Sequence, residues 1–231
     1  MNVGSLLAKL FEKLPEWYIK NDLRYFLAFS KIVPKFISDI SPVKGYELNR
    51  KLKPGDIVVD AGAYPGDYAI LASRKVGKQG KVICFEPDSK NRKILQKNLR
   101  KTGMNNFIII PKGLWNKNTK LGLNISDGLH SSLSENKNIS EIDVVRLDDE
   151  LKKIGIKKID VLKMDIEGAE IQAIQGCKST LLKSKPYVII ASYHIVNGKV
   201  TANFLETFLK KIGYEVKSDF PKHLTTYGWK N

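Results

Sequence analysis

From residue 53 onward, short apolar runs alternate with segments of helical length, and this alternation limits the possible folds more than any other feature. The expected strands are residues 56–61, 81–86, 107–111, 159–165 and 187–193. The expected helices are residues 67–75, 88–101, 169–182 and 201–212, and two late strands follow at 214–218 and 224–229. Strands that alternate with helices indicate βαβ units with right-handed crossovers. The sequence therefore predicts an α/β fold with a doubly wound, mostly parallel sheet and a terminal antiparallel hairpin.

Residues 112–147 interrupt this alternation. Strand-like pieces at 120–126 and 142–147 flank a polar stretch that is rich in Asn and Ser. We expect an inserted hairpin and loop that lie over the carboxyl edge of the sheet.

Residues 1–50 differ from the rest of the chain and are expected to be helical. Apolar residues recur at helical spacing from Leu6 to Phe29, and prolines divide the region into short pieces. We predict an N-terminal helical cap at residues 1–50 and a main domain at residues 51–231. A substrate lid, or a basic surface that makes peripheral contact with a membrane, remains the alternative for the first segment.

The composition bears on the environment of the protein more than on its fold. Cys84 and Cys177 do not form a disulfide framework or a zinc-site pattern, which suits a reducing cytoplasm. We expect neither a secretory signal nor a transmembrane helix. The net charge of +15 favours anionic surroundings, but the lysines are scattered along the chain, so a solvated basic surface is the preferred interpretation. The oligomeric state is not set by these features.

The loop after the first expected strand has the composition of a ligand-binding turn. It reads Asp60-Ala61-Gly62-Ala63-Tyr64-Pro65-Gly66-Asp67, and ligands of open parallel sheets bind beyond such strand ends. The glycine spacing is G-x-x-x-G, unlike the G-x-G-x-x-G of dinucleotide sites, which argues against a nicotinamide-dependent oxidoreductase. Two flanking carboxylates repel a pyrophosphate but attract an ammonium and a sulfonium, the charges of S-adenosylmethionine. Asp67 has the alternative role of an acid at a helix start.

The second expected strand ends in Phe85-Glu86-Pro87. An acid at this position accepts hydrogen bonds from the two hydroxyls of a ribose in nucleotide-binding folds. The alternative is that Glu86 pairs with one of the nearby lysines. We predict that Glu86 binds the ribose of the cofactor.

The strand at 159–165 contains Lys163 within an apolar run, and buried charges need partners. We expect Lys163 to pair with Asp165, Glu167 or Glu170, either for structure or for catalysis. Two carboxylates, Asp165 and Glu167, are too few to indicate a metal site, and none is predicted.

The three histidines have different expected roles. His194 follows the strand at 187–193 and is the candidate general base for a hydroxyl acceptor, with a hydrogen-bonded structural role as the alternative. His130 lies in a loop that covers the cofactor in one interpretation, and His223 is expected to be structural.

Three segments resemble the FkbM-type family of methyltransferases: VVDAGAYPGDYA, ICFEPD and LKMDIEGAE. The similarity extends from about Gly55 to Tyr193, and D-I-E-G-A-E is its most specific part. The resemblance implies the class I methyltransferase fold, S-adenosyl-L-methionine as cofactor, and O-methylation of a small-molecule or glycan hydroxyl. It also implies that Asp165 and Glu167 line the reaction centre beside the methyl group. Ser192 departs from the family, since many members have an acid shortly before the matching histidine.

The residue patterns and the family resemblance together give one set of predicted site residues. The catalytic residues are His194, Asp165 and Glu167. The cofactor-binding residues are Asp60, Gly62, Ala63, Tyr64, Gly66, Asp67, Glu86, Pro87 and Asp165.

The sequence therefore predicts an O-methyltransferase that acts on a hydroxyl of a small molecule, lipid or sugar. An RNA methyltransferase is the first alternative, because residues 88–101 carry several Lys and Arg side chains, although no RNA-binding module is recognisable. A nucleotide-binding protein without catalysis is the second alternative. The presence of Asp60, Glu86, Asp165 and Glu167 argues against it, because an inactive site has no need of this group of acids.

Overall fold

The computed structural model describes residues 46–47, 49–126, 130–134, 140–219 and 224–230, with the side chains of 123–140 left aside. Residues 46–231 form one compact unit. Most of the helical cap predicted for residues 1–50 lies outside the described residues, and so do its alternatives as a lid or a membrane-contacting surface. The division into a cap and a main domain stays a prediction.

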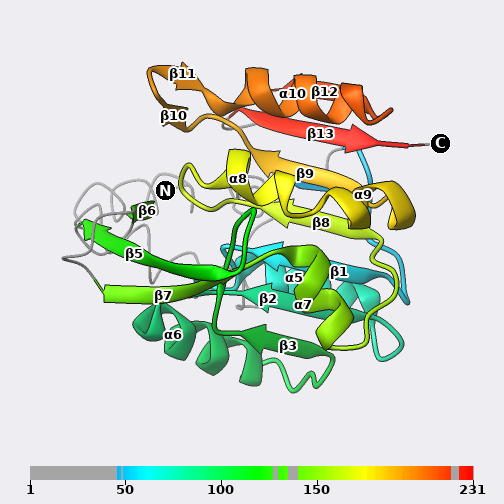
Figure 1. The fold of residues 1–231 in the computed structure, drawn as a ribbon. Helices are drawn as coiled ribbons and strands as arrows, with labels where there is room; N and C mark the ends of the chain where they lie inside the picture. The colour runs from blue at the N-terminus through cyan, green and yellow to red at the C-terminus, as the bar shows by residue number, and fades with distance from the viewer. Residues whose placement is uncertain (1–45, 48, 127–129, 135–139, 220–223, 231) are drawn as a thin grey trace, which may run out of the picture. The chain divides into compact units, whose positions relative to one another are not determined.

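The main unit is a mixed α/β structure (Figure 1). Its large sheet has the strand order β12-β13-β9-β8-β1-β2-β3. The strands of this sheet are β1 (Ile57–Ala61), β2 (Lys81–Phe85), β3 (Phe107–Ile110), β8 (Val161–Met164), β9 (Tyr187–Ala191), β12 (Glu215–Asp219) and β13 (Thr225–Trp229). The helices are α5 (Asp67–Val76), α6 (Ser89–Arg100), α7 (Leu147–Lys153), α8 (Glu170–Gln175), α9 (Lys178–Ser184) and α10 (Thr201–Lys211).

The pairing of the strands confirms the predicted topology. β3, β2, β1, β8 and β9 are mutually parallel, whereas β13 is antiparallel to both β9 and β12. The chain moves outward from β1 through β2 to β3 and then returns to the other side of β1 with β8. This reversal places a topological switch point at β1 and β8, where ligands of such sheets bind.

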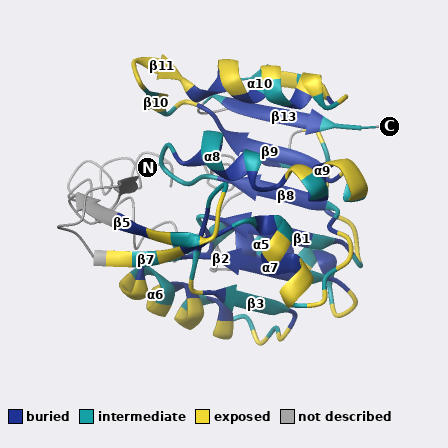
Figure 2. Cartoon of the chain, viewed as in Figure 1, coloured by how far each residue is buried: buried dark blue, intermediate teal, exposed yellow. Residues whose placement is uncertain are grey.

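The central strands are buried on both faces, which explains their continuous apolar sequences. The side chains of Val59, Ile83, Leu162 and Ile190 are inaccessible to solvent, and the helices cover them. Figure 2 shows this core in dark blue and the outer face of α6 in yellow. In α6 only Leu95 and Leu99 are buried, so its lysines face solvent. Among the described residues, no helix combines the length and apolarity needed to cross a bilayer.

The predicted insertion forms a small second sheet with the order β4-β7-β5-β6. Its strands are β4 (Gly113–Leu114), β5 (Thr119–Ser126), β6 (His130–Ser134) and β7 (Ser140–Val145). β5 pairs with β7 as the predicted hairpin strands, and β6 adds an edge strand that the sequence did not indicate. Figure 1 shows this sheet on the side where the parallel strands of the large sheet end, as expected.

The helical segment predicted at about residues 169–182 is present, but it is divided into α8 and α9. At Gly176 between them, an added Cβ would lie 2.0 Å from the carbonyl oxygen of Trp115, so the insertion approaches the backbone here. Asp148 of α7 then accepts hydrogen bonds from the backbone N–H (2.8 Å) and hydroxyl (2.7 Å) of Thr180 at the start of α9. Helix α7 itself was not predicted, and its first residue is the last residue of the expected strand at 142–147.

Candidate active site

Asp60 and Lys163 form a buried ion pair at the switch point. They are register partners on β1 and β8, and Lys163 Nζ lies 2.9 Å from Asp60 Oδ1 with both side chains almost inaccessible. Burial opposes the charge of Lys163, but the carboxylates of Asp60 and Asp165 raise the pKa of Lys163 above its usual value. Lys163 Nζ also donates to the carbonyl of Gly62 at 3.0 Å. The pair therefore fixes the turn after β1.

This ion pair corrects the expected partner of Lys163 and bears on the expected role of Asp60. The expected partners of Lys163 were Asp165, Glu167 or Glu170, but the cross-strand neighbour Asp60 holds the ammonium group instead. Because the Asp60 carboxylate faces inward, its geometry favours an indirect role in shaping the cofactor loop. That Asp60 contacts the cofactor stays a prediction.

Position 62 requires a glycine because the backbone of Asp165 approaches it closely. Its φ is +71°, and an added Cβ would lie 1.9 Å from the carbonyl oxygen of Asp165. The N–H groups of Gly62 and Ala63 both donate to the carbonyl of Phe85, at 3.1 and 3.2 Å. The loop after β1 is thus tied to the ends of both β2 and β8, and Gly66 (φ +113°) ends the loop at the start of α5.

Glu86 lies at the carboxyl end of β2 and is 5% exposed. Its side chain accepts hydrogen bonds from the backbone N–H groups of Tyr64 at 3.3 Å and Asp88 at 3.0 Å. The structure thus gives Glu86 backbone partners in place of the lysine that was its alternative. Burial raises the pKa of Glu86 to about 7, so its carboxyl group changes charge near neutral pH.

The other predicted cofactor residues lie around this carboxyl group. The carbonyl of Pro87 accepts a hydrogen bond from Arg92 Nη1 at 2.9 Å. Asp67 is half-buried and is the first residue of α5, which is compatible both with ligand binding and with the helix-start alternative. The structure therefore brings the loops after β1 and β2 together around Glu86.

A sharp turn after β8 presents the second group of predicted residues. Glu167 (φ +55°) and Gly168 (φ +97°) both have left-handed backbone conformations. Such a conformation is uncommon and costly for a residue with a side chain. Glu170, the first residue of α8, is fully buried and accepts the N–H of Ile166 at 2.9 Å. The turn therefore directs several carboxylates toward one point.

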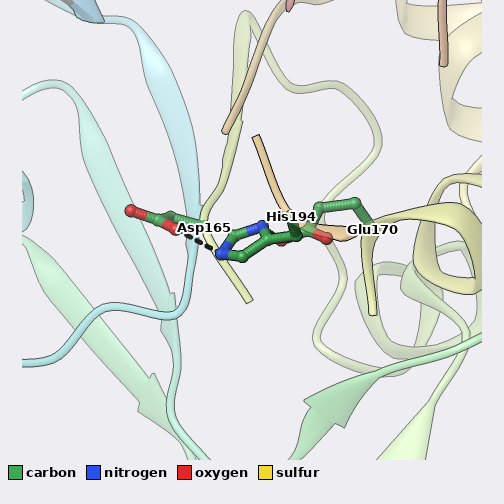
Figure 3. A group of neighbouring side chains, drawn as sticks. All are labelled: Asp165, Glu170 and His194. Atoms are coloured by element: carbon green, nitrogen blue, oxygen red, sulfur yellow. Dashed lines mark ion pairs between the residues drawn. The ribbon is translucent and has the colours of Figure 1, made fainter. Parts of the chain in front are cut away.

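His194 lies among these carboxylates (Figure 3). Its Nδ1 is 3.1 Å from Glu170 Oε1, and its Nε2 is 3.3 Å from Glu167 Oε2 and 3.9 Å from Asp165 Oδ1. Burial disfavours the charged ring, but pairing with Glu167, Glu170 and Asp165 outweighs it and raises the pKa of His194 to about 10. The ring therefore carries its proton at neutral pH in the free protein.

The fold thus brings together His194, Asp165 and Glu167, the three residues predicted to be catalytic. Glu170, which was expected only as a partner of Lys163, joins them. The role of His194 as general base stays a prediction, and it requires that the ring first lose its proton.

Sequence reasoning missed two tyrosines of the site. The hydroxyl of Tyr46 donates to Asp165 Oδ2 at 3.0 Å, and its ring lies 5.5 Å from Lys163 Nζ. Tyr193 stacks at a tilt on His194, with ring centroids 4.1 Å apart. Burial and then the charge of Asp165 raise the pKa of both phenols. Tyr46 precedes Asp165 by 119 residues, so no local pattern signals their contact.

A small hairpin after His194 was also missed. β10 (Ile195–Val196) and β11 (Lys199–Val200) pair across a turn at Asn197-Gly198, where both residues have positive φ. Asn-Gly is a common signal of such turns and could have indicated the hairpin. The backbone of His130 lies in β6, but its side chain is outside the description, as is all of His223.

Comparison with known proteins identifies the family. The sequence profile of the methyltransferase FkbM domain matches residues 60–216, which is more than half of the chain. The protein belongs to the FkbM methyltransferase family. This confirms the resemblance noted in its sequence. The matched range includes the loop Gly62–Gly66 and the His194 cluster, which consists of His194, Asp165, Glu167 and Glu170.

Two curated relatives of this FkbM-family chain are also methyltransferases. The 2-O-methyltransferase NoeI of Sinorhizobium fredii is 23% identical over 207 residues, covering 78% of this chain and 83% of that protein. The methyltransferase sdnD of Sordaria araneosa is 27% identical over 198 residues, covering 70% of this chain and 75% of that protein. Together with the family match, these similarities make the chain a methyltransferase.

Solved structures of other methyltransferases share the fold of this chain. An FkbM methyltransferase from Methylobacillus flagellatus superposes with a TM-score of 0.62 at 19% identity; the match covers 92% of this chain but 60% of that longer one. The fibrillarin of Aeropyrum pernix, solved with S-adenosyl-L-methionine bound, gives a TM-score of 0.54 at 15% identity, covering 88% of this chain and 76% of that one. The fold is therefore that of the class I methyltransferases, as predicted.

Proposed function

We propose that this methyltransferase uses S-adenosyl-L-methionine to methylate a hydroxyl oxygen of a small molecule, lipid or sugar. The observation that carries the proposal is the position of Glu86. Its carboxyl group lies at the carboxyl end of β2, beside the Gly62–Gly66 loop and next to the switch point of the sheet. This is where a nucleoside ribose lies in folds of this kind.

The residues present fit this cofactor. Gly62, Ala63, Tyr64, Gly66 and Pro87 form the wall of the proposed site, and Glu86 accepts hydrogen bonds from the ribose. Asp67 and Asp165 are the half-buried acids that complement the positive charges of the cofactor. Asp60 lies behind this wall and shapes it indirectly, because it pairs with Lys163, which in turn donates to the carbonyl of Gly62.

The His194 cluster is the proposed place of reaction. S-adenosyl-L-methionine, when bound, supplies a methyl group on a positively charged sulfur. The acceptor hydroxyl must lose its proton as its oxygen gains the methyl group, and the carboxylates of Asp165 and Glu167 lie where that proton can be taken up. His194 can receive it only after its ring has lost its own proton. The remaining contribution of the protein is to hold donor and acceptor in line and away from water.

The relative NoeI supports an oxygen acceptor, since its name describes 2-O-methylation. An RNA acceptor is the second candidate, because one surface feature favours it. Exposed basic side chains of α6 surround a shallow hollow of about 440 Å³ that is lined by Lys93, Gln96, Lys97, Arg100 and Lys101. Binding of RNA there would weaken steeply with added salt.

The deciding experiment supplies methyl-labelled S-adenosyl-L-methionine to the full chain with fractionated lipids, glycans and RNA. The expected result is label in an ether linkage of a lipid, glycan or small molecule. Label in RNA would favour the second candidate. Cofactor binding in calorimetry without transfer to any fraction would instead indicate a binding protein and overturn the proposal. Glu206→Gln, on the exposed face of α10, is the control and is expected to react normally.

A further inference from the structure

Figure 3 shows the His194 ring between Glu170 on one side and Asp165 on the other. The carboxylate of Glu167 lies near the same ring nitrogen as that of Asp165, and both are more accessible than Glu170. On the Nδ1 side, Glu170 is fully buried, and its Oε1 lies 3.1 Å from the ring nitrogen. The same Oε1 accepts the N–H of Ile166, which fixes the carboxylate in place. A carboxylate held in this way orients an imidazole and favours the form with its proton on the near nitrogen.

The opposite nitrogen, Nε2, faces Glu167 Oε2 at 3.3 Å and Asp165 Oδ1 at 3.9 Å. The His194 side chain is only 10% exposed. Among the described residues, neither nitrogen of the His194 ring nor Asp165 Oδ1 makes an aligned hydrogen bond, so Glu170 faces Nδ1 as a close charged neighbour. Oxygens of two carboxylates, at 3.3 and 3.9 Å, thus lie near one imidazole nitrogen, which can bind a cation once the ring has lost its proton.

The second oxygen of Asp165 is already held. Asp165 Oδ2 accepts the Tyr46 hydroxyl at 3.0 Å, so this carboxylate is oriented with Oδ1 toward the ring. Ligand atoms of Asp165, Glu170 and His194 all lie within 4.8 Å of one another, so this cluster is compact enough to hold one ion. Glu167 joins it through its 3.3 Å distance to His194 Nε2. Both the imidazole and the Asp165 carboxylate are thus fixed by residues behind them.

We propose that His194 Nε2, Asp165 and Glu167 bind a divalent cation, with Glu170 as the positioning residue behind the imidazole. One imidazole nitrogen and two carboxylate oxygens suit a first-row ion such as Mn²⁺ better than Mg²⁺ or Ca²⁺, which prefer oxygen ligands alone. The sequence indicated no metal site because only Asp165 and Glu167 stood close together in it. The fold adds His194 and Glu170. This proposal does not depend on the identity of the methyl acceptor.

The test titrates Mn²⁺ into the full chain, stripped of metal with a chelator, and follows free Mn²⁺ by electron paramagnetic resonance. Neither cofactor nor acceptor is present. We expect one saturable equivalent of Mn²⁺ and an increase in melting temperature when it binds. Glu167→Gln and His194→Ala should each weaken binding at least about tenfold, and Glu170→Gln by about 10- to 100-fold, as found for residues that orient metal ligands.

Asp149→Asn is the matched control, since it removes an exposed carboxylate on α7 that lies outside the cluster. It should bind Mn²⁺ like the parent protein. Circular dichroism verifies that each variant is folded. If His194→Ala does not fold, the test depends on Glu167→Gln. The proposal is overturned if the parent protein shows no saturable binding, or if Glu167→Gln binds as well as the control. Methyl transfer in the presence of chelator, with no Mn²⁺ binding, would sink this proposal and leave the proposed function intact.

Discussion

Asp60 and Lys163 face each other across the parallel strands β1 and β8, with their charged atoms 2.9 Å apart in the protein interior. A charge so deeply buried is tolerated because its partner is beside it. The pair also holds the carbonyl of Gly62, so it connects the stability of the sheet to the shape of the proposed cofactor loop.

Lys163→Met is therefore expected to destabilise the protein by about 3–5 kcal/mol, because it leaves Asp60 buried without its partner. The free energy of unfolding in urea measures this loss. The double variant Asp60→Asn/Lys163→Met should recover a large part of it, since no charge then remains buried. If the double variant is as unstable as Lys163→Met, the ion pair is not the source of the loss.

Gly62→Ala is expected to prevent stable folding or to cost well over the roughly 1–2 kcal/mol of a left-handed residue alone. The reason is the carbonyl of Asp165, which lies 1.9 Å from the position of an added Cβ. Gly55→Ala is the matched control. Gly55 also has a positive φ (+87°), but nothing lies within 4 Å of its added Cβ. Equal losses in thermal unfolding would contradict the close approach.

The alternation of apolar runs was enough to predict the large sheet, because buried parallel strands need continuous apolar sequences and their helices need one apolar face. Local patterns could not give contacts that form only in three dimensions. The break at Gly176 depends on the backbone of Trp115, and the start of α9 is held by Asp148. A single helix was the natural prediction without them.

The same limit applies to the site. Glu86 could be predicted as a site residue because it stands at a strand end, where ligands of this fold bind. Asp165 and Glu167 were predicted from the family resemblance, and the fold places them beside His194. The partner of Lys163 was missed because the sequence does not give the register between β1 and β8. The acids nearest to Lys163 along the chain were therefore its predicted partners. Tyr46 was missed because it belongs to a segment with no pattern shared with the sheet.

Glu86→Ala is expected to weaken binding of S-adenosyl-L-methionine by about 1–3 kcal/mol through loss of hydrogen bonds to the ribose. Titration calorimetry measures this change. Glu206→Gln serves as control and should bind normally. Unchanged affinity in Glu86→Ala would remove the ribose assignment, although not the fold.

The same carboxyl group predicts a pH dependence of cofactor binding. Burial raises the pKa of Glu86 to about 7, so the group is mostly protonated below that pH and ionised above it. The ionised form is the stronger acceptor of hydroxyl hydrogen bonds. The affinity for S-adenosyl-L-methionine should therefore rise as the pH increases through about 7. Calorimetry between pH 5.5 and 8.5, roughly centred on that pKa, tests this, and Glu86→Gln should lose that part of the dependence.

In the metal-free protein, His194→Ala is expected to lower turnover by about 10²- to 10⁴-fold, the range for loss of a group that handles a proton in the transition state. Its affinity for S-adenosyl-L-methionine should stay near normal, because most proposed cofactor contacts lie at the ends of β1 and β2, and Asp165 keeps its hydrogen bond to Tyr46. Turnover and calorimetric affinity are measured on the same preparation. A loss of affinity equal to the loss of turnover would mean that His194 supports the cofactor loop, and unchanged turnover would exclude it from the reaction.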